Sequence, residues 1–238
     1  TGNQIGAILL EYILSESKKL GRLPENGYAV TSIVSTHLAR AICARYGVKL
    51  YETLTGIKNI ADQIRQHSDE GAERFLFAFE ESNGYMLNQA VRDKDGVMAA
   101  IAIAEIATLS KANGVTLIDQ LESIYKLYGY SAELSVSIDG AGIGDRFMKH
   151  LRALNGKLGE PGTELGVLDI KNYTDYMPES NVILYELNGL DWIAFRPSGT
   201  EPKFKIYFGF YGIESTAESR LARISKAVVA EINKYKDN

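Results

Sequence analysis

Hydrophobic and polar positions in the first half of the chain follow two alternating periods. Apolar residues spaced three and four apart indicate helices, whereas short apolar runs indicate buried strands. The predicted helices span 3–19, 37–46, 58–67, 96–112 and 116–129, and the predicted strands span 28–34, 48–54 and 75–79. The last strand (FLFAF) is apolar at every position, which is typical of a strand covered on both faces. This pattern predicts a three-layer α/β/α domain with a mostly parallel sheet.

The pattern changes after about residue 130. Strands are now predicted at 133–138, 164–170, 181–187, 191–196 and 204–210, and helices at 144–154 and 215–236. Leu187-Asn188-Gly189-Leu190 predicts a hairpin between two of these strands, because Asn-Gly accepts positive φ at both turn positions. We therefore predict two domains, 1–130 and 131–238, with the boundary within 128–134. The second is a small α+β domain with a mostly antiparallel sheet.

Composition and charge limit the possible partners. The chain has 238 residues, of which 45% are hydrophobic and 24% charged, enough for one large core or two modest ones. Its formal net charge of −4 gives no global attraction to nucleic acid or to an anionic membrane, so any anion site must be local. No apolar run reaches the roughly 18 residues of a membrane span. The single Cys43, in an apolar helical pattern, fits a core position and a reducing compartment, and we expect a cytoplasmic protein.

The stretch FRPSGTEPKFKIYF, which begins at Phe195, is the first candidate for an anion site. Arg196 offers a planar fork of donors, Ser198 and Thr200 offer hydroxyls, and Gly199 lets backbone N–H groups approach an anion closely. Alternation along the following strand puts one set of polar side chains on one face, namely Lys203, Lys205 and Tyr207. The alternative is a solvated hairpin loop in which proline, serine and glycine only shape the turn.

The second candidate, EESNGY, directly follows the FLFAF strand. Ligands of open α/β sheets bind at the carboxyl ends of strands. Glu80 and the Ser82 hydroxyl suit the hydroxyl groups of a sugar. The alternative is a polar strand end in which Asn83 and Gly84 form a turn, and the residues alone favour neither interpretation.

Two further loops carry polar side chains next to helix starts. In VRDKDGV, Asp95 is placed to cap the following helix, while Lys94 lies between two carboxylates and could transfer a proton or contact phosphate. In TLTGIK, Thr55, Gly56 and Lys58 join a strand to a helix. This second loop fits either a ligand-facing position or a capped helix start.

The segment SIDGAGIGDRF resembles a dinucleotide-binding fingerprint only superficially. Its spacing is G-x-G-x-G and not G-x-G-x-x-G, so we predict a glycine-rich helix start. His37, His67 and His150 have no acidic or cysteine partner at ligand spacing, and no metal site is predicted in this chain.

Taken together, these stretches resemble the α-D-phosphohexomutase superfamily, the phosphoglucomutases and phosphomannomutases, and specifically their third and fourth domains. The most specific motif is RPSGTEP with its trailing lysine, which is similar to the family's C-terminal phosphate-binding loop. The resemblance implies a set of phosphate contacts, namely Arg196, Ser198, Gly199, Thr200 and Lys205.

The other motifs resemble loops of the family's third domain. EESNG resembles its sugar-recognition loop, which implies that Glu80 and Ser82 bind sugar hydroxyls in a loop completed by Asn83 and Gly84. RDKDG resembles a basic loop that places Lys94 near the transferring phosphate. TLTGIK resembles the loop associated with distinguishing sugar epimers. The form FEESNGY is closer to the phosphoglucomutase branch.

Two elements of the family do not occur in this sequence. One is the phosphoryl-carrying serine of the first domain, and the other is the D-x-D-x-D-R magnesium loop of the second. The resemblance therefore implies a C-terminal fragment of a Mg²⁺-dependent phosphoglucomutase that interconverts glucose 1-phosphate and glucose 6-phosphate through a phosphoserine and a bisphosphate.

The fragment is expected to bind sugar phosphate, to need the missing N-terminal domains and to be inactive alone. Within the superfamily, the alternatives are a phosphomannomutase and a phosphopentomutase. From other classes, they are a non-catalytic sugar-phosphate-binding module and a dinucleotide-binding protein built on GAGIG.

Overall fold

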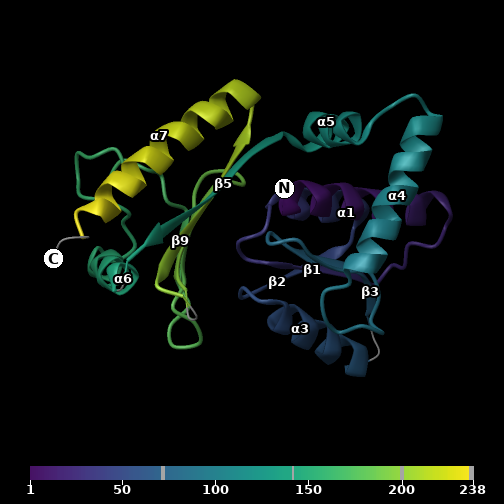
Figure 1. Cartoon of the computed structure of the whole chain (residues 1–238), viewed down its shortest axis with the longest axis horizontal. Helices are drawn as coiled ribbons and strands as arrows, with labels where there is room; N and C mark the ends of the chain where they lie inside the picture. Colours follow the sequence, from purple (N-terminus) through teal and green to yellow (C-terminus); the bar gives the residue numbers. More distant parts are fainter. Residues whose placement is uncertain (71–72, 141, 199–200, 236–238) are drawn as a thin grey trace. The chain divides into compact units, whose positions relative to one another are not determined.

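The structure is a computed structural model that describes residues 1–70, 73–140, 142–198 and 201–235 (Figure 1). The chain divides into two compact units, residues 1–129 and residues 130–238. Each unit has its own sheet, parallel for the most part in unit 1 and antiparallel in unit 2. This difference agrees with the change of pattern that the sequence shows near residue 130.

Unit 1 is built on a four-stranded sheet in the order β2-β1-β3-β4. Its strands are β1 (Gly27–Ser32), β2 (Lys49–Thr53), β3 (Arg74–Glu80) and β4 (Gly84–Met86). The first three run parallel, and the short β4 is antiparallel to β3. β1 is buried along its whole length and β3 along its second half, as expected of central strands.

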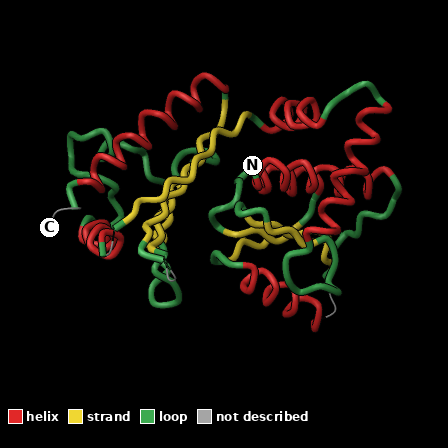
Figure 2. Tube along the Cα trace, viewed as in Figure 1, coloured by secondary structure: helices red, strands yellow, loops and turns green. Residues whose placement is uncertain are grey.

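The helices of unit 1 are α1 (Gly2–Lys19), α2 (Leu38–Tyr46), α3 (Ile57–Glu70), α4 (Gly96–Ala112) and α5 (Leu117–Tyr128). α1 and α3 lie on opposite sides of the sheet (Figure 2), so the predicted α/β/α layering is confirmed. Cys43 on α2 is buried, as predicted, and burial raises the pKa of its thiol to about 12. β4 was not predicted, because three residues after a tight turn carry no alternation of their own.

Unit 2 has a five-stranded antiparallel sheet in the order β5-β9-β8-β7-β6. Its strands are β5 (Tyr130–Asp139), β6 (Asn172–Asp175), β7 (Ile183–Glu186), β8 (Trp192–Pro197) and β9 (Lys203–Gly212). α6 (Ile143–Ala153) and α7 (Glu214–Asn233) lie on the same side of this sheet (Figure 2) and share one hydrophobic core with it. The predicted α+β class is confirmed.

One local prediction in unit 2 is wrong, and another is confirmed only in part. Residues 164–170 form turns and no strand, because Leu165 is buried whereas Val167 is 71% exposed, and the Leu168 N–H donates back to the Leu165 carbonyl oxygen. The strand of this region is β6, a few residues further on. The hairpin between β7 and β8 is confirmed, but only Gly189 (φ +68°) adopts the left-handed conformation, and Asn188 does not.

α4 carries apolar side chains around most of its circumference. Val97 and Ile101 are exposed, while Ala99 and Ile106 are buried. In the described part of the chain, no single helix is long and apolar enough to cross a membrane. α4 and α5 meet the length and composition criteria only as a pair, bent by 90°.

α1 approaches the sheet closely because two of its residues are glycines. A Cβ atom on Gly6 would overlap the ring of Phe79 on β3, and a Cβ atom on Gly2 would overlap the backbone of Glu81. The buried Tyr85 hydroxyl then donates to the Gly2 carbonyl oxygen at 3.1 Å. The first turn of α1 is thereby held against the carboxyl end of β3.

We expect Gly6→Ala to destabilise unit 1 by about 1–3 kcal/mol, the usual cost of adding a methyl group to a closely packed core. Gly96→Ala is the matched control, because a Cβ atom there would have no neighbour within 4 Å. Urea unfolding of both variants measures the difference. Equal stability of the two variants would contradict the close approach of α1 to β3.

Candidate functional site

The carboxyl ends of β1, β2 and β3 meet at one edge of unit 1. The Ile33 N–H donates to the Thr53 carbonyl oxygen at 2.8 Å, which joins the ends of β1 and β2. The Ser32 hydroxyl donates to Glu81 Oε2 at 3.1 Å, which joins the ends of β1 and β3. The loops that follow the three strands are therefore neighbours, at the edge where open α/β sheets bind ligands. Sequence reasoning missed Ser32, because a serine inside a strand pattern gives no signal of its partner.

The EESNG loop forms a turn and also presents polar groups to solvent. Asn83 adopts φ +63°, so the turn interpretation describes its backbone correctly. Ser82 and Asn83 are exposed, whereas the Glu80 side chain is only 7% exposed and lies against Gly84. A Cβ atom on Gly84 would lie 2.6 Å from Glu80 Oε1, so the glycine leaves room for this carboxyl group.

The RDKDG loop is fixed at one end and open at its centre. Asp95 caps α4 by accepting the Met98 N–H at 2.9 Å, and its own N–H donates to the Tyr85 carbonyl oxygen at 2.9 Å. Lys94 is half-exposed, and its ammonium group lies 3.6 Å from a carboxylate oxygen of Asp93. Solvent-exposed pairs of this kind are weak, so Lys94 is available to another anion.

The TLTGIK loop has the geometry of a helix start. Gly56 adopts φ +113°, and the Asn59 amide donates to the carbonyl oxygens of Leu54 and Thr55 at 3.3 and 3.0 Å. Thr55 is half-buried and Lys58 is exposed. The loop follows β2 and so lies at the same edge as the EESNG loop.

The RPSGTEP loop belongs to unit 2, where it joins β8 to β9. The Ser198 N–H donates to the Lys203 carbonyl oxygen at 2.8 Å, and the Ser198 hydroxyl accepts the Glu201 N–H at 3.3 Å. These bonds close the loop tightly. Gly199 and Thr200, both predicted to contact phosphate, lie outside the described residues.

Two cationic side chains face each other beside this loop. Arg196 on β8 is paired in register with Lys205 on β9. Residues directly opposite in an antiparallel pair have Cβ atoms about 4.5–5.5 Å apart on one face, and like charges there repel. Within the described residues, Arg196 has no carboxylate partner. A bound anion would offset this repulsion.

Lys203, two residues before Lys205 on β9, differs from Arg196 in having a carboxylate partner. Lys203 pairs with Glu201 at 2.9 Å, and the hydrogen bond from Lys203 lowers the pKa of the Glu201 carboxyl group. As predicted, the alternate residues Phe204, Ile206 and Phe208 of β9 point into the core. Lys205 is the residue opposite Arg196, and its ammonium group also contributes to the lowered pKa of Glu201.

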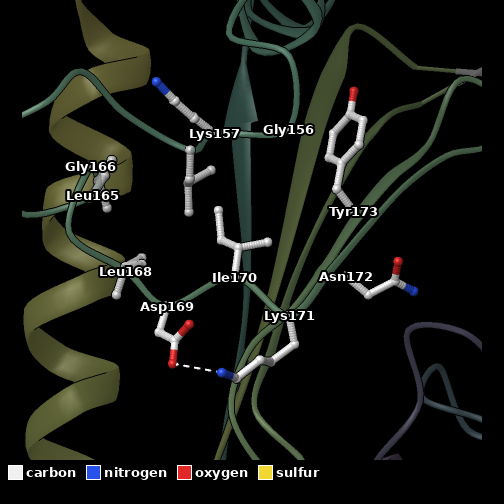
Figure 3. A pocket seen from close by; sticks show the side chains of 11 residues that line it. Gly156, Lys157, Leu165, Gly166, Leu168, Asp169, Ile170, Lys171, Asn172 and Tyr173 are labelled. Atoms are coloured by element: carbon white, nitrogen blue, oxygen red, sulfur yellow. Dashed lines mark ion pairs between the residues drawn. The ribbon is translucent and has the colours of Figure 1, made fainter.

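A separate pocket of unit 2 contains none of the predicted site residues. It encloses about 480 Å³ between residues 156 and 173 (Figure 3). Its lysine side chain Lys171 pairs with Asp169 at 2.9 Å, and this hydrogen bond, together with one from Asn188, lowers the pKa of Asp169. Lys157 also lines this pocket, so two lysines share it with one aspartate.

Metal binding needs several ligand side chains close together. No group of three or more histidine, cysteine, aspartate or glutamate side chains among the described residues is arranged to hold a metal ion. The one Asp-x-Asp sequence, Asp93 and Asp95, is divided between a bond to the backbone of Lys94 and the cap of α4.

Comparison with known proteins places this geometry in a family. The sequence model of the phosphoglucomutase/phosphomannomutase α/β/α domain III matches residues 1–128. The chain belongs to the phosphoglucomutase/phosphomannomutase family. The matched residues are almost the whole of unit 1, which carries the EESNG, RDKDG and TLTGIK loops.

The curated relatives of this chain are longer. A phosphoglucomutase of Staphylococcus aureus strain MSSA476 is 36% identical over 228 residues, covering 87% of this chain and 39% of that protein. Strain USA300 has one that is 36% identical over 224 residues. The chain thus spans about two-fifths of the length of the curated relatives it matches.

Solved structures share the fold. Parafusin, a phosphoglucomutase from Paramecium, covers 100% of this chain with a TM-score of 0.70 at 22% identity, and the chain covers 42% of it. A phosphoglucomutase/phosphomannomutase family protein from Burkholderia thailandensis covers 97% of the chain with a TM-score of 0.59 at 14% identity, and the chain covers 42% of it. At these identities the likeness concerns the fold alone.

We expect Tyr85→Phe to lower the stability of unit 1 by roughly 1–2 kcal/mol, because it leaves the buried Gly2 carbonyl oxygen without its hydroxyl donor. Tyr12→Phe is the matched control, since its hydroxyl bonds Glu105 in a more exposed setting. Hydrogen exchange of the first turn of α1 measures the effect. Equal exchange in the two variants would show that Tyr85 does not hold α1.

Proposed function

We propose that this chain supplies the sugar-binding and phosphate-binding part of a phosphoglucomutase that interconverts glucose 1-phosphate and glucose 6-phosphate. The observation that carries the proposal is the register pairing of two cationic residues, Arg196 and Lys205, beside the closed RPSGTEP loop. Membership of the phosphohexomutase family, and relatives that are phosphoglucomutases, support the choice of reaction.

The loop is suited to one demand of such a reaction. A phosphoglucomutase that works through a bisphosphate must hold the non-reacting phosphate in two orientations of the sugar. A guanidinium group, an ammonium group, hydroxyls and backbone N–H groups recognise the phosphate and not the carbon that bears it. The proposed contacts are Arg196, Ser198, Gly199, Thr200 and Lys205.

Unit 1 would recognise the sugar. In this proposal Glu80 and Ser82 bind hydroxyl groups from the EESNG loop, whose turn is made by Asn83 and Gly84. The half-exposed Lys94 contacts the transferring phosphate or moves a proton. The loop of Thr55, Gly56 and Lys58, at the same edge, distinguishes sugar epimers.

The chemistry of bond breaking would come from N-terminal domains of the same polypeptide. These domains would carry the phosphoserine and the ligands of a Mg²⁺ ion, which neutralises charge on the transferring phosphoryl group. The residues of this chain would position the substrate, which is a large part of catalysis in phosphoryl transfer. A cytoplasmic location suits the reduced, buried thiol of Cys43.

A second candidate is a phosphomannomutase, because the family model that matches unit 1 includes both activities. Comparing kcat/KM of the complete polypeptide for glucose 1-phosphate and mannose 1-phosphate decides between them. A preference for mannose 1-phosphate would replace glucose as the substrate and leave the phosphate loop unchanged.

We expect Arg196→Ala to lower kcat/KM of the complete polypeptide by about 10- to 150-fold, the equivalent of losing a charged hydrogen bond of roughly 1.5–3 kcal/mol. The fold should stay intact, since Arg196 has no ionic partner among the described residues. The control is Arg22→Ala, which removes an exposed arginine from unit 1. Equal kinetics of both variants would refute the phosphate role of Arg196.

We expect the chain of residues 1–238, purified and supplied with Mg²⁺ and glucose 1,6-bisphosphate, to show no conversion of glucose 1-phosphate. The reason is that the proposed nucleophile and metal ligands lie outside this sequence. A coupled assay for glucose 6-phosphate measures the reaction. Sustained turnover would mean that the chain contains its own catalytic groups.

A further inference from the structure

The glycine-rich start of α6 packs against the RPSGTEP loop. The Gly140 N–H donates to the Pro202 carbonyl oxygen at 3.1 Å. Gly144, in the first turn of α6, faces Pro197 and Phe204. These two residues are paired across β8 and β9, one at each end of the loop. The segment SIDGAGIGDRF, which resembles a dinucleotide-binding fingerprint only superficially, thus packs against the loop that we propose to bind phosphate.

The approach at Gly144 leaves little room for a side chain. A Cβ atom there would lie 3.0 Å from Phe204 Cδ2 and 3.2 Å from Pro197 Cβ, closer than ordinary contact. Phe204 is fully buried, and its ring packs against Phe147 and Phe195 with centroids 6.0 and 6.2 Å apart. Closely packed rings cannot step aside without moving their neighbours. The strain of an added methyl group would pass to the ends of the loop.

Local helix chemistry gives no other reason for a glycine at this position. Glycine is among the poorest helix formers, and alanine is the best. The left-handed conformation that favours glycine occurs at Gly142 (φ +75°), the residue before the helix, and Gly144 itself is an ordinary helical residue. The close contact with Pro197 and Phe204 is what excludes a larger residue.

We propose that Gly144 is a positioning residue for phosphate binding: the absence of its side chain lets α6 seat both ends of the loop and so fixes the separation of the groups that hold phosphate. This inference rests on the proposed function of the loop. Arg196 precedes Pro197 and Lys205 follows Phe204, so a displacement of this pair moves both cations. Small displacements of binding groups cost rate and affinity steeply.

The test is a graded series, Gly144→Ala and Gly144→Val, in the complete polypeptide. We expect the KM for glucose 1-phosphate to rise several-fold for the alanine variant and on the order of tenfold or more for the valine variant, with a smaller change in kcat. The control is Gly159→Ala, in unit 2, where a Cβ atom would lie 2.7 Å from Leu165 Cβ and next to Gly166 and Thr163, none of which belongs to the loop. It should lower the melting temperature and leave KM unchanged.

A second measurement separates positioning from activity. In the ligand-free chain of residues 1–238, Gly144→Ala should shift the amide resonances of Ser198 and Lys203, whose N–H groups close the loop. Gly159→Ala should leave these resonances in place. A folded Gly144→Ala variant with unshifted loop amides and native KM would overturn the inference. Failure of the wild-type protein to use or bind sugar phosphate would instead overturn the proposed function, while the amide shifts would still decide whether Gly144 sets the loop.

Discussion

The antiparallel register of β8 and β9 is the constraint on which the proposed function depends. It places Arg196 opposite Lys205 on one face, and the hydrogen bond from the Ser198 N–H to the Lys203 carbonyl oxygen closes the loop between them. Two like charges at this separation oppose folding unless an anion lies between them. Both cations lie beside the loop that we propose to bind an anion, in a chain of net negative charge, while neighbouring Lys203 pairs with Glu201.

Close approach of helices at glycine positions organises both units. In unit 1, Gly2 and Gly6 bring α1 against the end of β3, where the EESNG loop begins. In unit 2, Gly144 brings α6 against the ends of the RPSGTEP loop. In each case a helix contacts the residues that flank a candidate loop, and the helix contributes no side chain at the point of contact. Rigid elements thereby hold loops whose own turn residues would leave them free to move.

Most helices and strands, and the fold class of each unit, could be predicted from the sequence, because helix and strand periods are set by burial along each element. It did not predict contacts between distant residues. The alternation of ELGVLDI favoured a strand, but Leu165 and Val167 have opposite burial, and this depends on tertiary packing. The partner of Ser32 and the contacts of Gly144 could not be predicted either, since these partners lie far away in the sequence. The chemistry of Arg196 was readable, but its register with Lys205 was not.

The most direct test of the account is the binding of phosphate to the chain of residues 1–238, followed by the amide resonances of Ser198, Lys203 and Lys205. The account predicts that inorganic phosphate, glucose 1-phosphate and glucose 6-phosphate shift the same three resonances, because the loop recognises the phosphate and not the carbon that carries it. Unphosphorylated glucose should leave them in place. Resonances that respond to none of the three phosphates, or that respond equally to glucose, would contradict the account.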